Sequence, residues 1–178
     1  GLRPGSGTAF RLTGSSGGTI SPGTYSSITV SGSQTLTMNP GLYVVNGDIS
    51  FSSSGQLVGS GVTIISSGSI NFSGSSSASL SAPDSQTTSG GVPGVLYAST
   101  STSANSVTGS TGMPVSGLIY TPNASMTFTG SSAVNGCTEV VALKIRMTGS
   151  SSTEANCAVY GLPQYGSVAG SAAARLVR

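Results

Sequence analysis

The sequence contains no histidine and no tryptophan, and only 6% of its 178 residues are charged. Without an imidazole, the chain cannot build a Ser-His-Asp or a Cys-His nucleophilic device. Six basic residues against four acidic ones give a net charge of +2, which is too small to hold nucleic acid or anionic lipid by charge. We therefore expect no nucleic-acid partner, and membrane contact only through a segment outside this sequence.

Carboxylates are equally scarce, and their positions argue against an enzyme. Glycosidases need two carboxylates about 5 to 9.5 Å apart, and a calcium site needs more oxygen ligands than isolated acids supply. The only lysine, Lys144, lies at the end of an expected strand, where a solvated charge is the simpler interpretation. We therefore predict a non-enzymatic protein with no catalytic residue, no metal ion and no other cofactor. The four acids, at different points of the pattern, are Asp48, Asp84, Glu139 and Glu154.

What the chain has instead is glycine, serine, threonine and β-branched residues in alternation. Glycine occupies 27 positions, 36% of the residues are hydrophobic, and the mean hydropathy is +0.20. Apolar residues recur two apart, as in β-strands, and no helical period persists. The composition therefore predicts an all-β fold rather than a disordered chain.

One strand motif recurs at a nearly constant distance along the chain. Its copies Ile28-Thr29-Val30, Ile49-Ser50-Phe51 and Ile70-Asn71-Phe72 start 21 residues apart, and the motif resumes at 126–128 and 145–147 with Val107 as a weaker rung. We expect the outer residues of each triplet to face inward and the middle residue to face water. The predicted inward core ladder consists of Ile28, Val30, Ile49, Phe51, Ile70, Phe72, Met126, Phe128, Ile145 and Met147.

Two further ladders complete the pattern. One passes through residues 43–45, 62–65, 95–97, 118–120 and 140–143, with Tyr97, Tyr120 and Leu143 at equal intervals. The other, weaker one passes through residues 36–38, 57–58 and Leu80. Three short strands per turn with glycine-rich corners are typical of a β-solenoid. The sequence thus predicts a single-domain parallel β-helix, right-handed, with about 20 residues per coil and no long helix.

The ladders also suggest how the chain is divided. Residues 1–18 are rich in Gly and Ser and are expected to lead into or cap the body, which spans 19–160. Residues 161–178 are expected to form a capping tail, because an uncovered solenoid end exposes an open strand edge. The spacing breaks at 84–93 and at 99–112, which predicts two loops that leave the stack.

The two cysteines lie at matching points of a repeated unit. Residues 126–132 lead to Cys137, and the similar residues 145–151 lead to Cys157. In stacked coils the two would be about 4.8 Å apart, within the usual Cα distance for a disulfide. A Cys137–Cys157 disulfide would indicate an oxidising compartment, and the alternative is a pair of separate buried thiols.

The order of the motifs is more specific than any one of them. The chain reads PGLYVVNGD at 40–48, GSGVTI at 59–64, LSAP at 80–83, GVLY at 94–97, GLIYTPNA at 117–124 and CTEVVA at 137–142, before a Thr-Gly-Ser-Ser rung, Cys157 and ARLVR at 174–178. This order resembles the C-terminal region of TadG-like proteins of bacterial Tad (Flp) pilus systems, over about residues 19–178.

The resemblance implies an exported, non-catalytic β-helix at the cell surface or outside the cell. It implies a role in pilus or surface-filament assembly or attachment, with protein partners in the cell envelope or the pilus. Two alternatives stay open: a ligand-binding adhesin that uses the 84–93 and 99–112 loops, and an ice-binding β-solenoid that orders water on rows of threonine. End-to-end association of copies through the solenoid ends also stays open.

Overall fold

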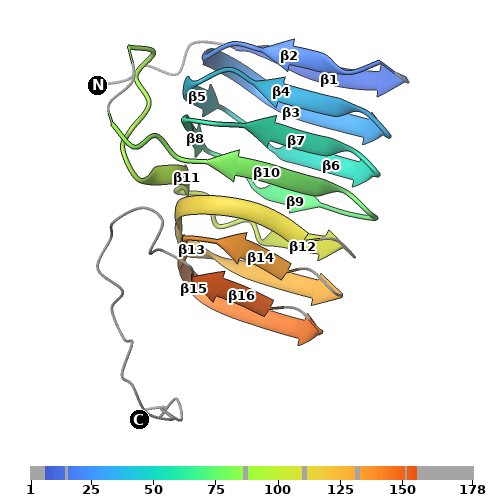
Figure 1. The fold of residues 1–178 in the computed structure, drawn as a ribbon, viewed down its shortest axis with the longest axis vertical. Helices are drawn as coiled ribbons and strands as arrows, with labels where there is room; N and C mark the ends of the chain where they lie inside the picture. Colours follow the sequence, from blue (N-terminus) through green and yellow to red (C-terminus); the bar gives the residue numbers. More distant parts are fainter. Residues whose placement is uncertain are drawn as a thin grey trace.

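The computed structural model describes residues 7–14, 16–85, 88–109, 112–130, 133–150 and 152–155. Within these ranges the chain forms strands, turns and no helix, and every strand pair is parallel. The strands wind into stacked coils that run from β1 and β2 at one end to β15 and β16 at the other (Figure 1). The predicted parallel β-solenoid is therefore confirmed.

Most strands are short because each coil has three sides, whereas β3, β13 and β15 continue through a corner from one side to the next. They are β1 (Thr8–Gly14), β2 (Gly18–Ile20), β3 (Gly23–Gly32), β4 (Thr35–Met38), β5 (Gly41–Val45), β6 (Ile49–Ser53), β7 (Gln56–Gly59), β8 (Val62–Ser66), β9 (Ile70–Phe72), β10 (Ser77–Ser81), β11 (Val95–Ser99), β12 (Asn105–Gly109), β13 (Gly112–Gly130), β14 (Ala133–Gly136), β15 (Thr138–Gly149) and β16 (Ser152–Ala155).

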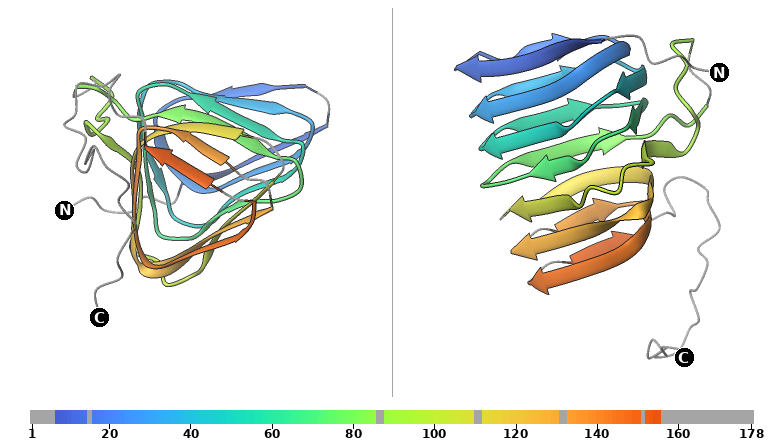
Figure 2. Two further views of the ribbon diagram at one scale, coloured as in Figure 1. Left: turned by 60° about the horizontal axis from the view of Figure 1, so that its bottom comes forward. Right: turned by 180° about the vertical axis from the view of Figure 1, so that it is seen from behind.

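Strand pairing between coils produces three ladders. The first ladder contains β1, the second half of β3, β6, β9, β12, the end of β13 and the end of β15. The second contains the start of β3, β5, β8, β11, the middle of β13 and the start of β15. The third contains β2, β4, β7, β10, the start of β13, β14 and β16. Viewed along the stack the coils are triangular and wind right-handed (Figure 2).

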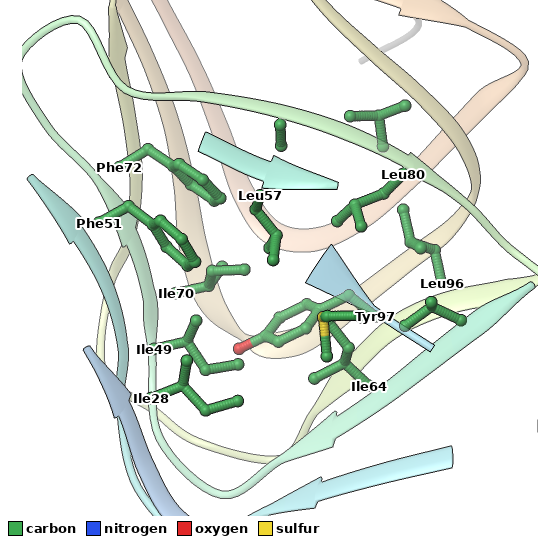
Figure 3. Close-up of a cluster of buried hydrophobic side chains, with 14 of the residues drawn as sticks. Ile28, Ile49, Phe51, Leu57, Ile64, Ile70, Phe72, Leu80, Leu96 and Tyr97 are labelled. Carbon is green, nitrogen blue, oxygen red and sulfur yellow. The ribbon is translucent and has the colours of Figure 1, made fainter. Parts of the chain in front are cut away.

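The core is built from side chains stacked in columns. In the first ladder Ile28 pairs with Ile49 and Ile49 with Ile70, so the constant spacing of 21 residues is also the strand register. Phe51 and Phe72 lie side by side in the core (Figure 3), and their rings stack with centroids 4.9 Å apart and planes 11° from parallel. Eight members of the predicted inward ladder are buried: Ile28, Val30, Ile49, Phe51, Ile70, Phe72, Met126 and Phe128.

The last two members of that ladder lie on the final rung. Ile145 pairs with Met126, and Met147 pairs with Phe128, so both are in the predicted register. Ile145 is nevertheless 47% exposed and Met147 43%, against 2% for Met126. The difference arises because β15 forms hydrogen-bonded ladder pairs on one side only within the described residues.

The predicted loop at 99–112 is largely wrong, because β12 lies within it as a rung of the first ladder. Ser106 pairs with Asn71 and with Thr127, and Val107 pairs with Phe72 and is 4% exposed. The rung begins with Asn105, which is only 1% exposed. Its Oδ1 accepts a hydrogen bond from the Ile70 amide at 2.9 Å, so a polar residue occupies a core position with its acceptor satisfied.

The expected equivalence of Tyr97, Tyr120 and Leu143 is also wrong. A register shift between Val95 and Tyr97 places Tyr97 opposite Ile119, while Tyr120 lies opposite Ala98. Because side chains alternate along a strand, this one-residue offset sends Tyr97 inward and Tyr120 outward. Tyr97 is 3% exposed and Tyr120 43%.

The loop predicted at 84–93 does leave the stack, and its described residues 88–93 fold back onto the second ladder. The Leu42 amide donates to the Ser89 carbonyl at 3.0 Å, and the Val92 amide donates to the Thr63 hydroxyl at 2.8 Å. Thr63 is completely buried beneath this loop, and its hydroxyl donates to the Val95 carbonyl at 2.9 Å. The loop therefore covers the outer side of β5 and β8.

One buried side chain is poorly matched to its surroundings. Gln34 is 1% exposed, and neither its Oε1 nor its Nε2 has a hydrogen-bond partner. Burying an unpartnered amide costs about 1 to 3 kcal/mol, whereas methionine has a similar shape and no such cost. We therefore expect Gln34→Met to raise the free energy of unfolding by about 1 kcal/mol in urea titrations followed by circular dichroism. Gln56→Met, on the next coil, removes only an exposed hydrogen bond from the Thr35 hydroxyl and should change it by less than about 0.5 kcal/mol, and a loss of stability in Gln34→Met would contradict the assignment.

Candidate functional site

The most regular surface of the molecule is the outer side of the first ladder. One outward residue from each rung lies in register with the next, between inward residues such as Val30 and Phe51. Five of the seven members are uncharged and carry a hydroxyl or an amide. In order along the stack the column is Arg11, Thr29, Ser50, Asn71, Ser106, Thr127 and Arg146.

A second column runs parallel to it, two residues further along each strand. Its members in register are Thr13, Ser31 and Ser52 at one end, and Thr108, Thr129 and Thr148 at the other. Neighbouring hydroxyls are close enough to pair: those of Ser106 and Thr108 lie 3.4 Å apart, and the Thr148 hydroxyl donates to that of Thr129 at 3.2 Å. We name the two columns together the hydroxyl face. Sequence reasoning found five members of the first column and missed Arg11, Ser106 and the second column.

The other two sides of the triangle differ in chemistry. The outward column of the second ladder is mostly apolar, and the contacts of the 88–92 segment lie beside it, at Leu42 and Thr63, two residues earlier on β5 and β8. Its members in register are Thr24, Val44, Ile65, Ala98, Tyr120 and Val141. The third ladder mixes polar and apolar residues, with Thr19, Thr37, Val58 and Ser79 in register. Among the described residues the first ladder carries the longest polar column, seven residues in register, against three in the third ladder at Thr35, Gln56 and Ser77.

The acids do not gather anywhere in the described part of the chain. Asp48 lies at the corner before β6, where its Oδ1 accepts hydrogen bonds from the Ser69 amide at 2.8 Å and the Ser69 hydroxyl at 2.9 Å. Asp84 follows β10, Glu139 pairs with Leu118, and Glu154 pairs with Asn135. Among the described residues no group of three or more Asp, Glu or Cys could hold a metal ion.

The interior contains a small cavity, but its lining is apolar. It measures about 50 Å³ and lies where the coils change length, among residues that include Ala78, Phe72 and Met113. Ala78 pairs with Leu57, which in turn pairs with Leu36, so a small residue takes the place of leucine in this column. An apolar cavity of this size has no groups to orient a polar substrate.

Two buried tyrosines serve as hydrogen-bond donors within the core. The Tyr43 hydroxyl lies 2.7 Å from the Asn39 carbonyl and 2.9 Å from that of Ile20. Burial, reinforced by the neighbouring Tyr25, raises the pKa of Tyr43, although the hydrogen bond to Asn39 opposes this. Burial also raises the pKa of Tyr97, whose hydroxyl donates to the Gly68 carbonyl at 3.3 Å. Both therefore stay protonated and fix the coils rather than act as acids.

The cysteines fall on either side of the limit of the described chain. Cys137 is 8% exposed and lies between β14 and β15, where its carbonyl accepts a hydrogen bond from the Gly117 amide at 2.8 Å. Cys157 lies outside the described residues, so the Cys137–Cys157 disulfide stays a prediction. The proposed capping tail at 161–178 lies outside them as well.

The disulfide can be tested by mass and by stability. If it forms, reduction should raise the intact mass by two hydrogens. Reduction should also lower the free energy of unfolding by about 3 kcal/mol, because the bond closes the loop from Cys137 to Cys157 in the unfolded chain and so restricts it. The Cys137→Ser variant, treated in the same way, is the control and should show neither change. An unaltered mass on reduction of the parent chain would exclude the bond.

Comparison of the chain with protein-family models, with curated proteins and with solved structures gave no match. Among the residues described, no helix is long and apolar enough to cross a membrane.

Proposed function

We propose that this chain is a non-enzymatic, extracellular structural and interaction module of a Tad/Flp-type pilus system, which acts in pilus or surface-filament assembly or attachment. The observation that carries the proposal is the hydroxyl face, a continuous polar surface in register over seven rungs. A rigid, repetitive surface of this kind suits binding to a repetitive partner such as a filament. The order of sequence motifs, which resembles TadG-like proteins, supports the pilus context.

The proposal is tested in cells whose Tad/Flp system encodes this chain. Ser50→Lys with Ser106→Lys places two ammonium groups on the hydroxyl face, and burying them against a partner without counter-charges should weaken binding at least about tenfold. We expect fewer surface pili in electron micrographs and reduced attachment to surfaces. Thr37→Lys with Ser79→Lys, on the third ladder, is the matched control and should leave both unchanged. Normal piliation and attachment in the first variant would refute the proposed face.

The loop-based adhesin predicts a different result. In that case attachment depends on the 84–93 segment, which presents Val92 at 41% exposure. Val92→Lys should then reduce attachment while pilus number stays normal. A loss of attachment in the hydroxyl-face variant alone would favour the structural module.

Ice binding is a second candidate, because one observation favours it specifically. Four rungs of the hydroxyl face carry a hydroxyl in both columns, and on one of them both are threonine, Thr127 and Thr129, so paired hydroxyls could hold water. Purified protein would then show thermal hysteresis, and Ser50→Lys with Ser106→Lys would remove it. Absence of hysteresis in the parent protein would exclude this function.

A further inference from the structure

The two ends of the solenoid are complementary surfaces. At one end β1 pairs only with β3, and at the other the last part of β15 pairs only with β13, within the described residues. Within the described residues each of these strands therefore has ladder pairs along one edge, and the outer edges of both belong to the same first ladder. The two ends lie at opposite extremes of the stack (Figure 1).

The side chains at the two ends would also match if one copy stacked on the next. Phe10 and Leu12 begin the same columns that Ile145 and Met147 end. Phe10 and Leu12 are half-buried, while Ile145 and Met147 are 47% and 43% exposed. A copy placed in register would set Ile145 against Phe10 and Met147 against Leu12, which continues the core without a break.

Among the described residues, it is charge that opposes this contact. The first column of the hydroxyl face is uncharged on its five inner rungs and carries arginine on its first and last rungs, at Arg11 and Arg146. The register that joins the apolar residues also places Arg146 of one copy directly opposite Arg11 of the next. Like charges directly opposite each other destabilise a strand pair. Charged residues on edge strands are a common means of preventing edge-to-edge association.

We propose that the two ends form a head-to-tail interface between copies of this chain, and that the Arg11–Arg146 repulsion makes the stacking depend on ionic strength. The contact joins different surfaces by a translation along the stack, so it does not close and it generates linear filaments. Salt screens the repulsion while it leaves backbone pairing and the apolar contact in place. The inference rests on the ends alone and is independent of the pilus assignment, which is tested in cells.

The experiment measures filament formation by the purified full-length chain, by sedimentation and negative-stain electron microscopy. At about 10 mM salt the Debye length is about 30 Å, so the parent protein should form discrete short rods. At about 1 M salt the length falls to about 3 Å, and linear stacks should appear. Rods at both salt concentrations, or filaments at both, would overturn the ionic control.

Charge reversal at one end gives the sharper test. Arg146→Glu places a carboxylate opposite Arg11 of the next copy, so filaments should form at low salt with a critical concentration roughly five- to tenfold below that of the parent. Added salt should weaken these filaments, which is the opposite of the parent's response. Arg11→Glu should behave in the same way, whereas the double variant restores like charges and should again give rods at low salt.

A matched control separates end charge from net charge. Thr37→Glu with Ser79→Glu lowers the net charge by the same two units as Arg146→Glu but acts on inner rungs of the third ladder, away from both end strands and from the hydroxyl face. It should keep the parent's rods at low salt. Circular dichroism spectra equal to the parent's would show that each variant is folded. If Arg146→Glu stays as rods at every salt concentration, or if the control assembles equally well, the interface is wrong.

Discussion

Replacing Phe51 by alanine is expected to lower the free energy of unfolding by about 3 to 5 kcal/mol. Phe51 is 1% exposed in the centre of the stack, and its ring lies against that of Phe72 with centroids 4.9 Å apart. Truncation removes the transfer free energy of the ring and this stacking contact, and it leaves a cavity between two coils. Because each coil of a solenoid contacts only its neighbours, the surrounding structure has few ways to fill that space. Urea unfolding followed by circular dichroism measures the loss.

The same change at the end of the stack provides the control. Phe10 is half-buried and has a neighbouring rung on one side only within the described residues. Phe10→Ala should therefore cost about 1.5 kcal/mol, because less apolar surface returns to water. Equal losses at the two positions would mean that the stack does not derive its stability from the inner columns.

The inner columns are also the part of the fold that could be predicted from sequence. Strands impose a side-chain period of two, and coils of constant length impose a second period, so Ile28, Ile49 and Ile70 indicate both at once. Where the coil length is constant, residue spacing and strand register coincide. The two-residue period and the constant coil length both recur along the chain, so one sequence is enough to predict the inner columns.

The predictions fail where a polar residue occupies a core position, where the strand register shifts by one residue, or where a loop interrupts the repeat. Asn105 occupies the place of an isoleucine, and its side chain accepts a hydrogen bond from the Ile70 amide, so the apolar pattern indicates the β12 rung only weakly, through Val107. The shift between Val95 and Tyr97 changes the phase by one residue, which spacing alone cannot reveal. The return of the 84–93 loop onto Thr63 depends on tertiary contacts that leave no periodic signal.

The hydroxyl face was partly visible for a related reason. Outward residues are not constrained by packing, so Thr29, Ser50 and Asn71 vary and form an irregular series in the sequence. Their alignment becomes a surface only when the register is fixed by the inward residues on either side. The contrast between neutral inner rungs and terminal arginines could not be seen because Arg11 was not placed: it pairs with Thr29, 18 residues later, so β1 falls outside the 21-residue spacing of the next rungs.

Replacing Gly68 by alanine is expected to have the second large effect, a loss of about 3 kcal/mol in the free energy of unfolding. A Cβ atom at Gly68 would lie 2.4 Å from the carbonyl carbon of Gly47 and 2.7 Å from the amide nitrogen of Asp48, on the preceding coil. These are backbone atoms and cannot turn aside as a side chain can. The two coils must therefore separate at this corner, where the Gly68 carbonyl also accepts a hydrogen bond from the Ser99 hydroxyl at 2.9 Å.

The appropriate control is a glycine at which a Cβ atom would strain the backbone conformation but would not clash with neighbouring atoms. Gly94 has φ of +72°, and no heavy atom lies within 4 Å of the point that a Cβ would occupy, so Gly94→Ala should cost only the left-handed penalty of about 1 kcal/mol. If the Gly68 variant loses no more than the Gly94 variant in parallel urea titrations, the coils can part at the corner without penalty. A larger loss at Gly68 locates the cause in the close approach of the two backbones, which sets how tightly successive coils stack.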